Sequence, residues 1–205
     1  MQQSSDAPFL DISWPSTLTG GTVATLGPSG TSSQLAAERL IGRLVADGIP
    51  GTGAELFPSY EDAAAAVLGG GADLMVVANA YAGISDFYMN TRLCLAGAFH
   101  NRTPLYGIAV PPGTTELSGP VRIASHPAPV PLIAQLLPDH LTVEETILTK
   151  STSQAALAAC SGVVDAALTT QPSAELYGLT FVSRVRPIEM LWSVFRAVDS
   201  GRAAA

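Results

Sequence analysis

The order of hydrophobic and polar positions predicts strands and helices that alternate along most of the chain. Short apolar runs, typical of buried strands, occur at 22–27, 53–59, 72–80, 122–127, 142–148, 165–170 and 180–185. Apolar residues at helical spacing predict helices at 32–46, 60–70, 129–137, 152–161 and 171–177. Because such alternation is typical of proteins with parallel sheets, the pattern predicts an α/β fold.

The distribution of prolines predicts two lobes. Eight of the 15 prolines fall between Pro104 and Pro138, which suits a crossover between lobes better than the middle of one sheet. We therefore expect an N-terminal arm over 1–19, a first lobe made of 20–103 and 185–205, and a second lobe over 104–184. Because ligands bind at the carboxyl ends of strands in open parallel sheets, we expect a ligand in the cleft between the lobes.

Composition favours a compact protein that does not bind nucleic acid. Hydrophobic residues make up 47% of the 205 residues and charged residues 13%, while the net charge of −7 argues against nucleic-acid binding. The sequence has neither a long apolar run nor a basic start followed by an apolar core, so we expect no membrane span, no secretory signal and a cytoplasmic location. Cys94 and Cys160 lack zinc-site spacing, and we expect no metal.

A glycine-rich turn at 27–33 has the features of an anion site. Its glycines permit close approach of a ligand, and Thr31, Ser32 and Ser33 can cap the next helix while donating hydrogen bonds. The amides and dipole at a helix start attract anions. An ordinary capped helix start would use the same residues, and this pattern alone leaves both interpretations open. The turn matches neither a P-loop nor a dinucleotide-binding motif.

Two further strand–helix junctions carry hydroxyl groups in the predicted second lobe. Ser151 or Thr152 would cap one helix, with Ser153 next to it, and Thr169 and Thr170 end a strand just before another helix. One junction of this kind carries little information. Three of them favour an anionic ligand over simple capping.

Polar and aromatic candidates for chemistry follow other predicted strands. Ser125 and His126 stand at a strand end, where His can act as an acid near neutral pH, although a structural role for this histidine is as plausible. Further candidates that could line a cleft are Asn79, Tyr81, Phe87, Tyr88 and Tyr106. For Phe87, core packing is the better interpretation. No nucleophile elbow is present, and the uncharged candidates argue against hydrolysis by a strong base.

Taken together, these landmarks resemble the prephenate dehydratase family. The matching segments, in order, are LGPSGTSSQLAA, VVANAYAG, ASHPAPVPLIAQ, STSQAALAA and DAALTTQPSAELYGL. They extend over about residues 22 to 195 of the chain. The resemblance implies a two-lobed, periplasmic-binding-protein-like (type II) α/β fold with prephenate in the cleft.

Three departures separate this chain from the dehydratases. The family pattern Asn-Ser-x-Glu-Gly is Asn-Ala-Tyr-Ala-Gly here, at 79–83. The family pattern Thr-Arg-Phe is replaced by Ser193, Val194 and Phe195. We also expect no regulatory ACT domain, because the sequence stops shortly after this motif.

The segments LGPSGTSS, AYAGISDFYM, TPLYGIAV and MLWSVF are more similar to the prephenate decarboxylases of the bacilysin (anticapsin) type. This resemblance implies loss of the ring carboxylate without aromatisation, retention of the ring hydroxyl, and no cofactor. The product, a dihydro-4-hydroxyphenylpyruvate, would lead to an amino acid of antibiotic biosynthesis. A dehydratase and a non-catalytic binder of small carboxylates stay open as alternatives, as does a homodimer.

The resemblance also assigns roles to the candidates. Donors for the two carboxylates of prephenate would be Thr31, Ser32, Ser33, Thr152, Ser153, Thr169 and Thr170, with Asn79, Phe87 and Ser125 also in contact with the substrate. Tyr81, Tyr88, Tyr106 or His126 would deliver or steer the proton. The stretch that begins at Ser193 would suppress dehydration by supplying no charged partner near the hydroxyl.

Overall fold

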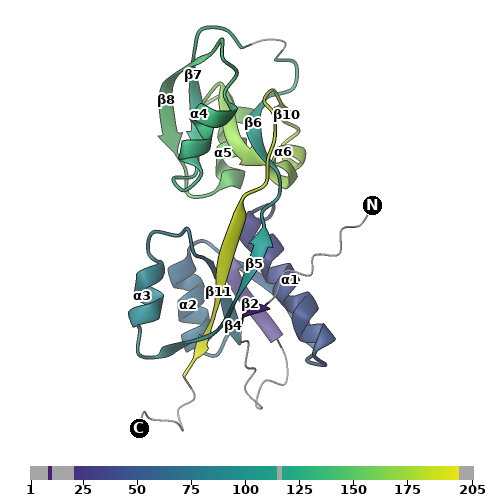
Figure 1. The fold of residues 1–205 in the computed structure, drawn as a ribbon, viewed down its shortest axis with the longest axis vertical. Helices are drawn as coiled ribbons and strands as arrows, with labels where there is room; N and C mark the ends of the chain where they lie inside the picture. The colour runs from purple at the N-terminus through teal and green to yellow at the C-terminus, as the bar shows by residue number, and fades with distance from the viewer. Residues whose placement is uncertain (1–8, 11–20, 115–116, 199–205) are drawn as a thin grey trace. The chain divides into compact units, whose positions relative to one another are not determined.

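The computed structural model describes residues 9–10, 21–114 and 117–198 and divides into two compact units (Figure 1). Unit 1 contains the described parts of Met1–Gly27, Ser33–Arg102 and Glu189–Ala205. Unit 2 contains Pro28–Ser32 and the described parts of Thr103–Ile188. The predicted arm over 1–19 lies outside the described residues except for β1 (Phe9–Leu10).

The described part of unit 1 forms a six-stranded sheet in the order β1-β5-β11-β4-β2-β3. Its further strands are β2 (Gly21–Leu26), β3 (Gly51–Phe57), β4 (Leu74–Ala78), β5 (Leu93–Arg102) and β11 (Glu189–Ala197). Strand β2 pairs in parallel with β3 and β4, whereas β11 pairs antiparallel with both β4 and β5. The carboxyl ends of β2 and β4 therefore lie at the same edge of the sheet.

Helices cover both faces of this sheet. Helix α1 (Ser32–Ala46) lies on one face, and α2 (Tyr60–Leu68) and α3 (Ile84–Met89) lie on the other (Figure 1). Because side chains alternate along a strand, β11 contributes to two cores. Trp192 and Val194 pack with the α1 side, while Phe195 packs with α2 and α3. Ser193 is one residue from Trp192 and Val194, so it points to the same face as Phe195.

Unit 2 has its own mixed sheet, in the order β10-β6-β9-β7-β8 within its described residues. The strands are β6 (Tyr106–Val110), β7 (Pro120–Ser125), β8 (Thr142–Leu148), β9 (Ala166–Thr170) and β10 (Thr180–Phe181). The helices are η1 (Val130–Leu132), α4 (Ile133–Leu136), α5 (Thr152–Cys160) and α6 (Gln171–Leu176). Fully buried alanines on α5 meet alanines of β7 and β9 in one core, which lets the helix lie close to the sheet.

The structure confirms the predicted α/β class and corrects two details of the strand pattern. Both sheets are mixed rather than parallel, because β11 and β6 run antiparallel to their neighbours. The predicted strand at 180–185 shortens to Thr180–Phe181. The elements without a prediction were β1, β5, β6, β11 and the short helix α3. Among the residues described, no helix is long and apolar enough to span a bilayer.

Candidate functional site

A chain of three hydrogen-bonding side chains lies in unit 1, where β4 ends. Asn79 directly follows β4, and Ser193 lies on the adjoining strand β11, opposite Val77. The hydroxyl of Ser193 donates to Asn79 Oδ1 at 3.0 Å and lies 2.6 Å from the Tyr88 hydroxyl. Since a serine hydroxyl has one proton, Tyr88 must be the donor in the second bond. The protons therefore run in one direction, from Tyr88 to Ser193 to Asn79.

Packing fixes the geometry of this chain. Ser193 is fully buried, whereas Tyr88 on α3 is 41% exposed. The Tyr88 ring stands edge-on to Phe195, with ring centroids 5.0 Å apart. The main-chain N–H of Asn79 donates to Leu191 O at 3.0 Å, which holds Asn79 against β11. The structure thus brings together three residues that the sequence analysis proposed separately.

A second pair of hydroxyls lies near the same edge of the sheet. Ser33 Oγ and Tyr60 Oη are 2.8 Å apart, and Tyr60 Oη also accepts a hydrogen bond from the main-chain N–H of Ala78 at 3.3 Å. Both side chains are buried. Tyr60 was missed by the sequence analysis, since the pattern at 60–70 predicts only a helix and does not indicate which hydroxyl its first residue meets.

The phenol of Tyr81 is bound to a carboxylate that the sequence analysis also missed. Tyr81 Oη donates to Glu61 Oε1 at 2.6 Å. This hydrogen bond, followed by burial and the negative charge of Glu61, raises the pKa of Tyr81 to about 12. Tyr81 therefore holds its proton firmly at neutral pH. No sequence pattern marks Glu61 as its partner, because the pair is separated by a strand and a turn.

In unit 2, the glycine-rich turn is itself held by hydroxyl groups. The carbonyl of Gly30 accepts hydrogen bonds from Thr170 Oγ1 at 2.9 Å and from Ser173 Oγ at 3.0 Å. Gly30 has φ +84, and a Cβ there would lie 3.1 Å from Ser173 Oγ. Ser32 Oγ lies 3.1 Å from the buried Tyr106 hydroxyl. The hydroxyl of Thr170, predicted to bind a ligand, is thus bonded to the turn.

The start of α5 combines an ordinary cap with an unpaired hydroxyl. Ser151 Oγ accepts a hydrogen bond from Gln154 N at 3.1 Å and caps the helix. Thr169 Oγ1 donates to Thr152 O at 2.8 Å. Ser153 Oγ is fully buried and has no hydrogen-bond partner among the described residues. A buried hydroxyl without a partner is costly, and it lies in the helix turn whose main-chain N–H groups attract anions.

The predicted pair Ser125 and His126 ends strand β7. Ser125 is fully buried and donates to His126 O at 2.8 Å. His126 Nδ1 accepts a hydrogen bond from Ala128 N at 3.3 Å, which requires a neutral ring with its proton on Nε2. Burial lowers the pKa of His126, so the neutral ring is also favoured electrostatically.

The remaining candidates are buried aromatic and hydroxyl side chains. Phe87 is only 5% exposed and packs in the core of unit 1 against Phe195, with ring centroids 6.1 Å apart, which favours the core role. Burial raises the pKa of Tyr106, and its bond to Ser32 offsets part of this rise. Thr31 is 5% exposed.

The cleft between the lobes stays a prediction. The described residues contain no cluster of three or more His, Cys, Asp or Glu side chains suited to a metal ion.

Comparison with known proteins gives close sequence relatives and more distant structural ones. No family model matches the chain. A prephenate decarboxylase from Bacillus subtilis is 36% identical over 177 residues, which cover 85% of each chain. A prephenate decarboxylase from Planktothrix agardhii (strain NIVA-CYA 126/8) is 35% identical over 175 residues, covering 84% of this chain and 86% of that one.

Solved structures share the fold at lower identity. Prephenate dehydratase from Arthrobacter aurescens, in complex with L-Phe, superposes with a TM-score of 0.67 at 16% identity over 87% of this chain, which spans 61% of the dehydratase. A periplasmic substrate-binding protein of an ABC transporter from Coxiella burnetii superposes with a TM-score of 0.54 at 16% identity, over 86% of this chain and 84% of that one.

These likenesses confirm the two-lobed, periplasmic-binding-protein-like α/β fold that the sequence analysis predicted. They also agree with the resemblance drawn from the motifs, since the relatives at 35–36% identity are decarboxylases rather than dehydratases. At 36% identity over 85% of both chains, the protein belongs to the prephenate decarboxylase family.

Proposed function

We propose that this protein is a carboxy-lyase that removes the ring carboxylate of prephenate and retains the ring hydroxyl. The product would be a dihydro-4-hydroxyphenylpyruvate, a precursor for an amino acid of secondary metabolism. Family membership supports the substrate and the loss of carbon dioxide. The observation that carries retention of the hydroxyl is the hydrogen bond by which Ser193 gives its proton to Asn79.

Decarboxylation of prephenate can give two products, and the atom that receives a proton decides which of them forms. When the bond to the ring carboxylate breaks, its electron pair enters the ring and carbon dioxide leaves. In a dehydratase, an acid protonates the ring hydroxyl, which departs as water, and the ring becomes aromatic. In a decarboxylase of this kind, the proton is added to a ring carbon, the hydroxyl stays, and a conjugated diene forms. The enzyme therefore sets the product by where it offers a proton.

The environment of Ser193 disfavours protonation of the ring hydroxyl. Ser193 occupies the position of the dehydratase Thr, but its only proton is bound to Asn79 Oδ1 and its side chain is fully buried. Val194 occupies the position of the dehydratase Arg. It is also fully buried, and it packs in the core on the opposite, α1-facing side of the sheet. Neither residue can offer an acidic proton or a positive charge to a leaving hydroxyl.

The proton donor is Tyr88 in this proposal. Tyr81 is bound to Glu61 and has a pKa raised to about 12, and Tyr106 is buried against Ser32. His126 is neutral, and a neutral imidazole is a weak acid. Tyr88 is the most exposed of these candidates, with 41% of its surface open, and its proton would turn from Ser193 Oγ, 2.6 Å away, toward the substrate when prephenate binds. A positioned phenol of this kind suits general acid catalysis.

The start of α5 holds a carboxylate of the substrate in this proposal. The unpaired Ser153 hydroxyl and the first main-chain N–H groups of α5 would donate to it. Thr169 and Thr170 support this site indirectly, because their hydroxyls bind Thr152 O and Gly30 O. No cofactor enters the scheme, since the ring itself accepts the electron pair.

Product analysis tests the proposal. The purified protein is incubated with prephenate at neutral pH, and phenylpyruvate and the hydroxyl-retaining product, which is heavier by one water, are quantified by mass spectrometry. A reaction without enzyme corrects for spontaneous aromatisation. We expect the hydroxyl-retaining product to dominate. Phenylpyruvate as the main enzymatic product would restore the dehydratase, and saturable binding without turnover would indicate a binding protein.

A further inference from the structure

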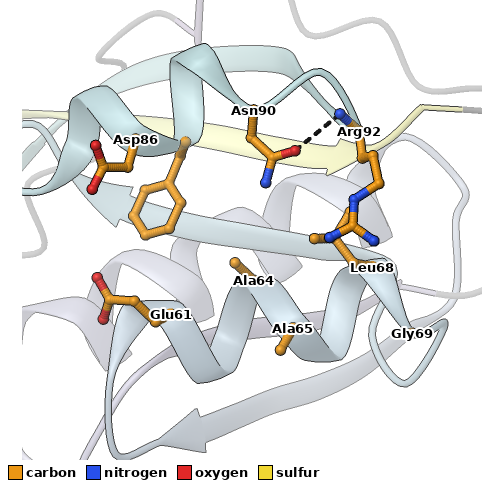
Figure 2. A pocket seen from close by; sticks show the side chains of 9 residues that line it. Glu61, Ala64, Ala65, Leu68, Gly69, Asp86, Asn90 and Arg92 are labelled. Atoms are coloured by element: carbon orange, nitrogen blue, oxygen red, sulfur yellow. Dashed lines mark hydrogen bonds between the residues drawn. The ribbon is translucent and has the colours of Figure 1, made fainter.

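A pocket of about 490 Å³ lies within unit 1 between α2 and α3 (Figure 2). Its lining residues come from one face of α2, from α3 and from the turn that leads into β5: Glu61, Ala64, Ala65, Leu68, Gly69, Asp86, Phe87, Asn90 and Arg92. Of these, only Phe87 belongs to the residue set proposed for the reaction. The volume is within the usual range for pockets that bind small molecules.

The pocket is polar at its two ends and apolar between them. Glu61 and Asp86 lie at one end, and the Arg92 guanidinium lies beside Leu68 at the other (Figure 2). Ala64 lies between these ends, and Phe87 also lines the pocket. Such a lining is complementary to a ligand that carries a positive charge at one end, a negative charge at the other, and an apolar body.

The Arg92 guanidinium, at the second end of the pocket, is available to bind a ligand. Within the described residues, the Arg92 guanidinium forms no hydrogen bond or salt bridge, and only its main chain is bonded, to Asn90 Oδ1 at 3.0 Å. That bond uses the amide oxygen of Asn90, so the amide NH2 group is left to donate beside Arg92. An arginine and an amide donor together suit a carboxylate.

The distance between the charged ends selects the length of the ligand. Glu61 and Leu68 are seven residues apart on α2, which corresponds to about 10 Å along the helix axis. A single α-amino acid cannot reach both ends, because one Cα atom joins its ammonium and carboxylate groups. An extended chain spans roughly 3.3–3.6 Å per residue, so about three residues match the distance.

We propose that this pocket binds a short zwitterionic peptide of about three residues. Its amino terminus lies between Glu61 and Asp86, its apolar side chain packs on Phe87, and its carboxylate binds Arg92. The proposal rests only on the pocket and is independent of the reaction assigned above. One lining residue also contacts a candidate for the reaction, since Glu61 accepts the hydrogen bond from Tyr81.

Titration of the isotopically labelled full chain with the peptide Ala-Phe-Ala tests this site. Amide chemical shifts of α2 and α3 report binding. We expect saturable shifts with the free-ended peptide, and affinity at least tenfold lower for the same peptide capped at both ends and for free phenylalanine. Absence of saturable shifts, or equal affinity for the capped peptide, would overturn the proposal.

A variant of Arg92 tests whether this residue binds the carboxylate of the peptide. Arg92→Gln should weaken binding of Ala-Phe-Ala about tenfold, whereas Arg43→Gln, on α1, should leave it unchanged. Amidation of the peptide's carboxyl end should weaken binding to the parent protein but cause no further loss in Arg92→Gln. If amidation weakens binding to both proteins equally, the carboxylate is not bound by Arg92 and the proposed orientation is wrong.

Discussion

Hydroxyl groups in unit 1 bond mainly to other side chains, whereas hydroxyl groups in unit 2 bond mainly to main-chain carbonyls. In unit 1, Tyr88 donates to Ser193 and Ser193 donates to Asn79. In unit 2, Thr169 and Thr170 donate to main-chain oxygens, and so do Ser125 and Ser173. The first arrangement fixes the direction in which the hydroxyl protons are donated, and the second fixes the main chain around a helix start.

This difference indicates a division of tasks. A chain of side-chain hydroxyls can direct a proton, because each group both donates and accepts. Hydroxyls bonded to carbonyls cannot, but they hold loops and helix ends in a fixed position. In unit 2, the Ser32 and Tyr106 hydroxyls bond to each other, and the hydroxyl of Ser153 has no partner among the described residues. We therefore expect changes in unit 1 to alter turnover and product, and changes in unit 2 to alter binding and stability.

The largest effect is expected for Tyr88→Phe. Removal of a general acid typically lowers the rate about 100- to 10,000-fold, so kcat should fall within that range while KM changes little. Steady-state kinetics with prephenate measure both. Tyr177→Phe, in unit 2, is the matched control and should keep kcat. A Tyr88→Phe enzyme with a normal kcat would assign proton delivery to another group.

The second largest effect is expected in unit 2, for Ser153→Ala. A hydrogen bond to a charged group contributes about 1.5–3 kcal/mol, so Ser153→Ala should lower kcat/KM roughly tenfold to a hundredfold, mainly through KM. Its unfolding free energy should rise rather than fall, because the change removes a buried hydroxyl that makes no bond within the described residues. Ser151→Ala is the contrasting variant, because it loses the helix cap and should lose about 1 kcal/mol of unfolding free energy. An unaltered KM in Ser153→Ala would remove α5 from the substrate site.

The third prediction concerns product choice in unit 1. Asn79→Leu removes the acceptor of the Ser193 proton and makes that proton available to the ring hydroxyl. Loss of a bond of about 1 kcal/mol corresponds to roughly a fivefold rise in the phenylpyruvate fraction. The double variant Asn79→Leu with Ser193→Ala has no such proton and should show no rise. An equal rise in both variants would mean that Ser193 does not control dehydration.

The sequence predicted the parallel part of each sheet better than the antiparallel part. Strands β2, β4, β7 and β9 are short apolar runs followed by helices or turns, so local pattern is enough to find them. Strand β11 returns from unit 2 to pair with two strands that lie far from it in sequence. Nothing in its own nine residues indicates those partners, since edge or central position depends on tertiary contacts.

The candidate site shows the same limit. Tyr88, Asn79 and Ser193 were each proposed from the sequence, but their mutual bonds depend on how α3 and β11 pack. Tyr60 and Glu61 lie in a segment whose pattern predicts only a helix. Their partners come from other elements of unit 1, so residue type and spacing could not identify them. Local chemistry was predictable, and the pairing of hydroxyls was not.

A smaller effect is expected for the hydroxyl-to-carbonyl bonds of unit 2. Thr170→Val keeps the side-chain shape but removes one of two hydroxyl donors to Gly30 O. A net hydrogen bond contributes about 1 kcal/mol, and the unfolding free energy measured with urea should fall by that amount. The additional change Ser173→Ala should cost more than the first, since it removes the second donor. An unchanged kcat at saturating prephenate separates this structural role from catalysis.

The smallest predicted effect is a pH dependence of stability that comes from the phenol of Tyr81, which is bound to the carboxylate of Glu61. Its folded-state pKa of about 12 lies above the value of about 10 in an unfolded chain. A raised pKa contributes stability that is fully present below pH 10 and is lost as pH rises from 10 to 12. The unfolding free energy of the parent protein should therefore fall more steeply over this interval than that of Tyr81→Phe. Parallel slopes would mean that the bond to Glu61 does not persist in solution.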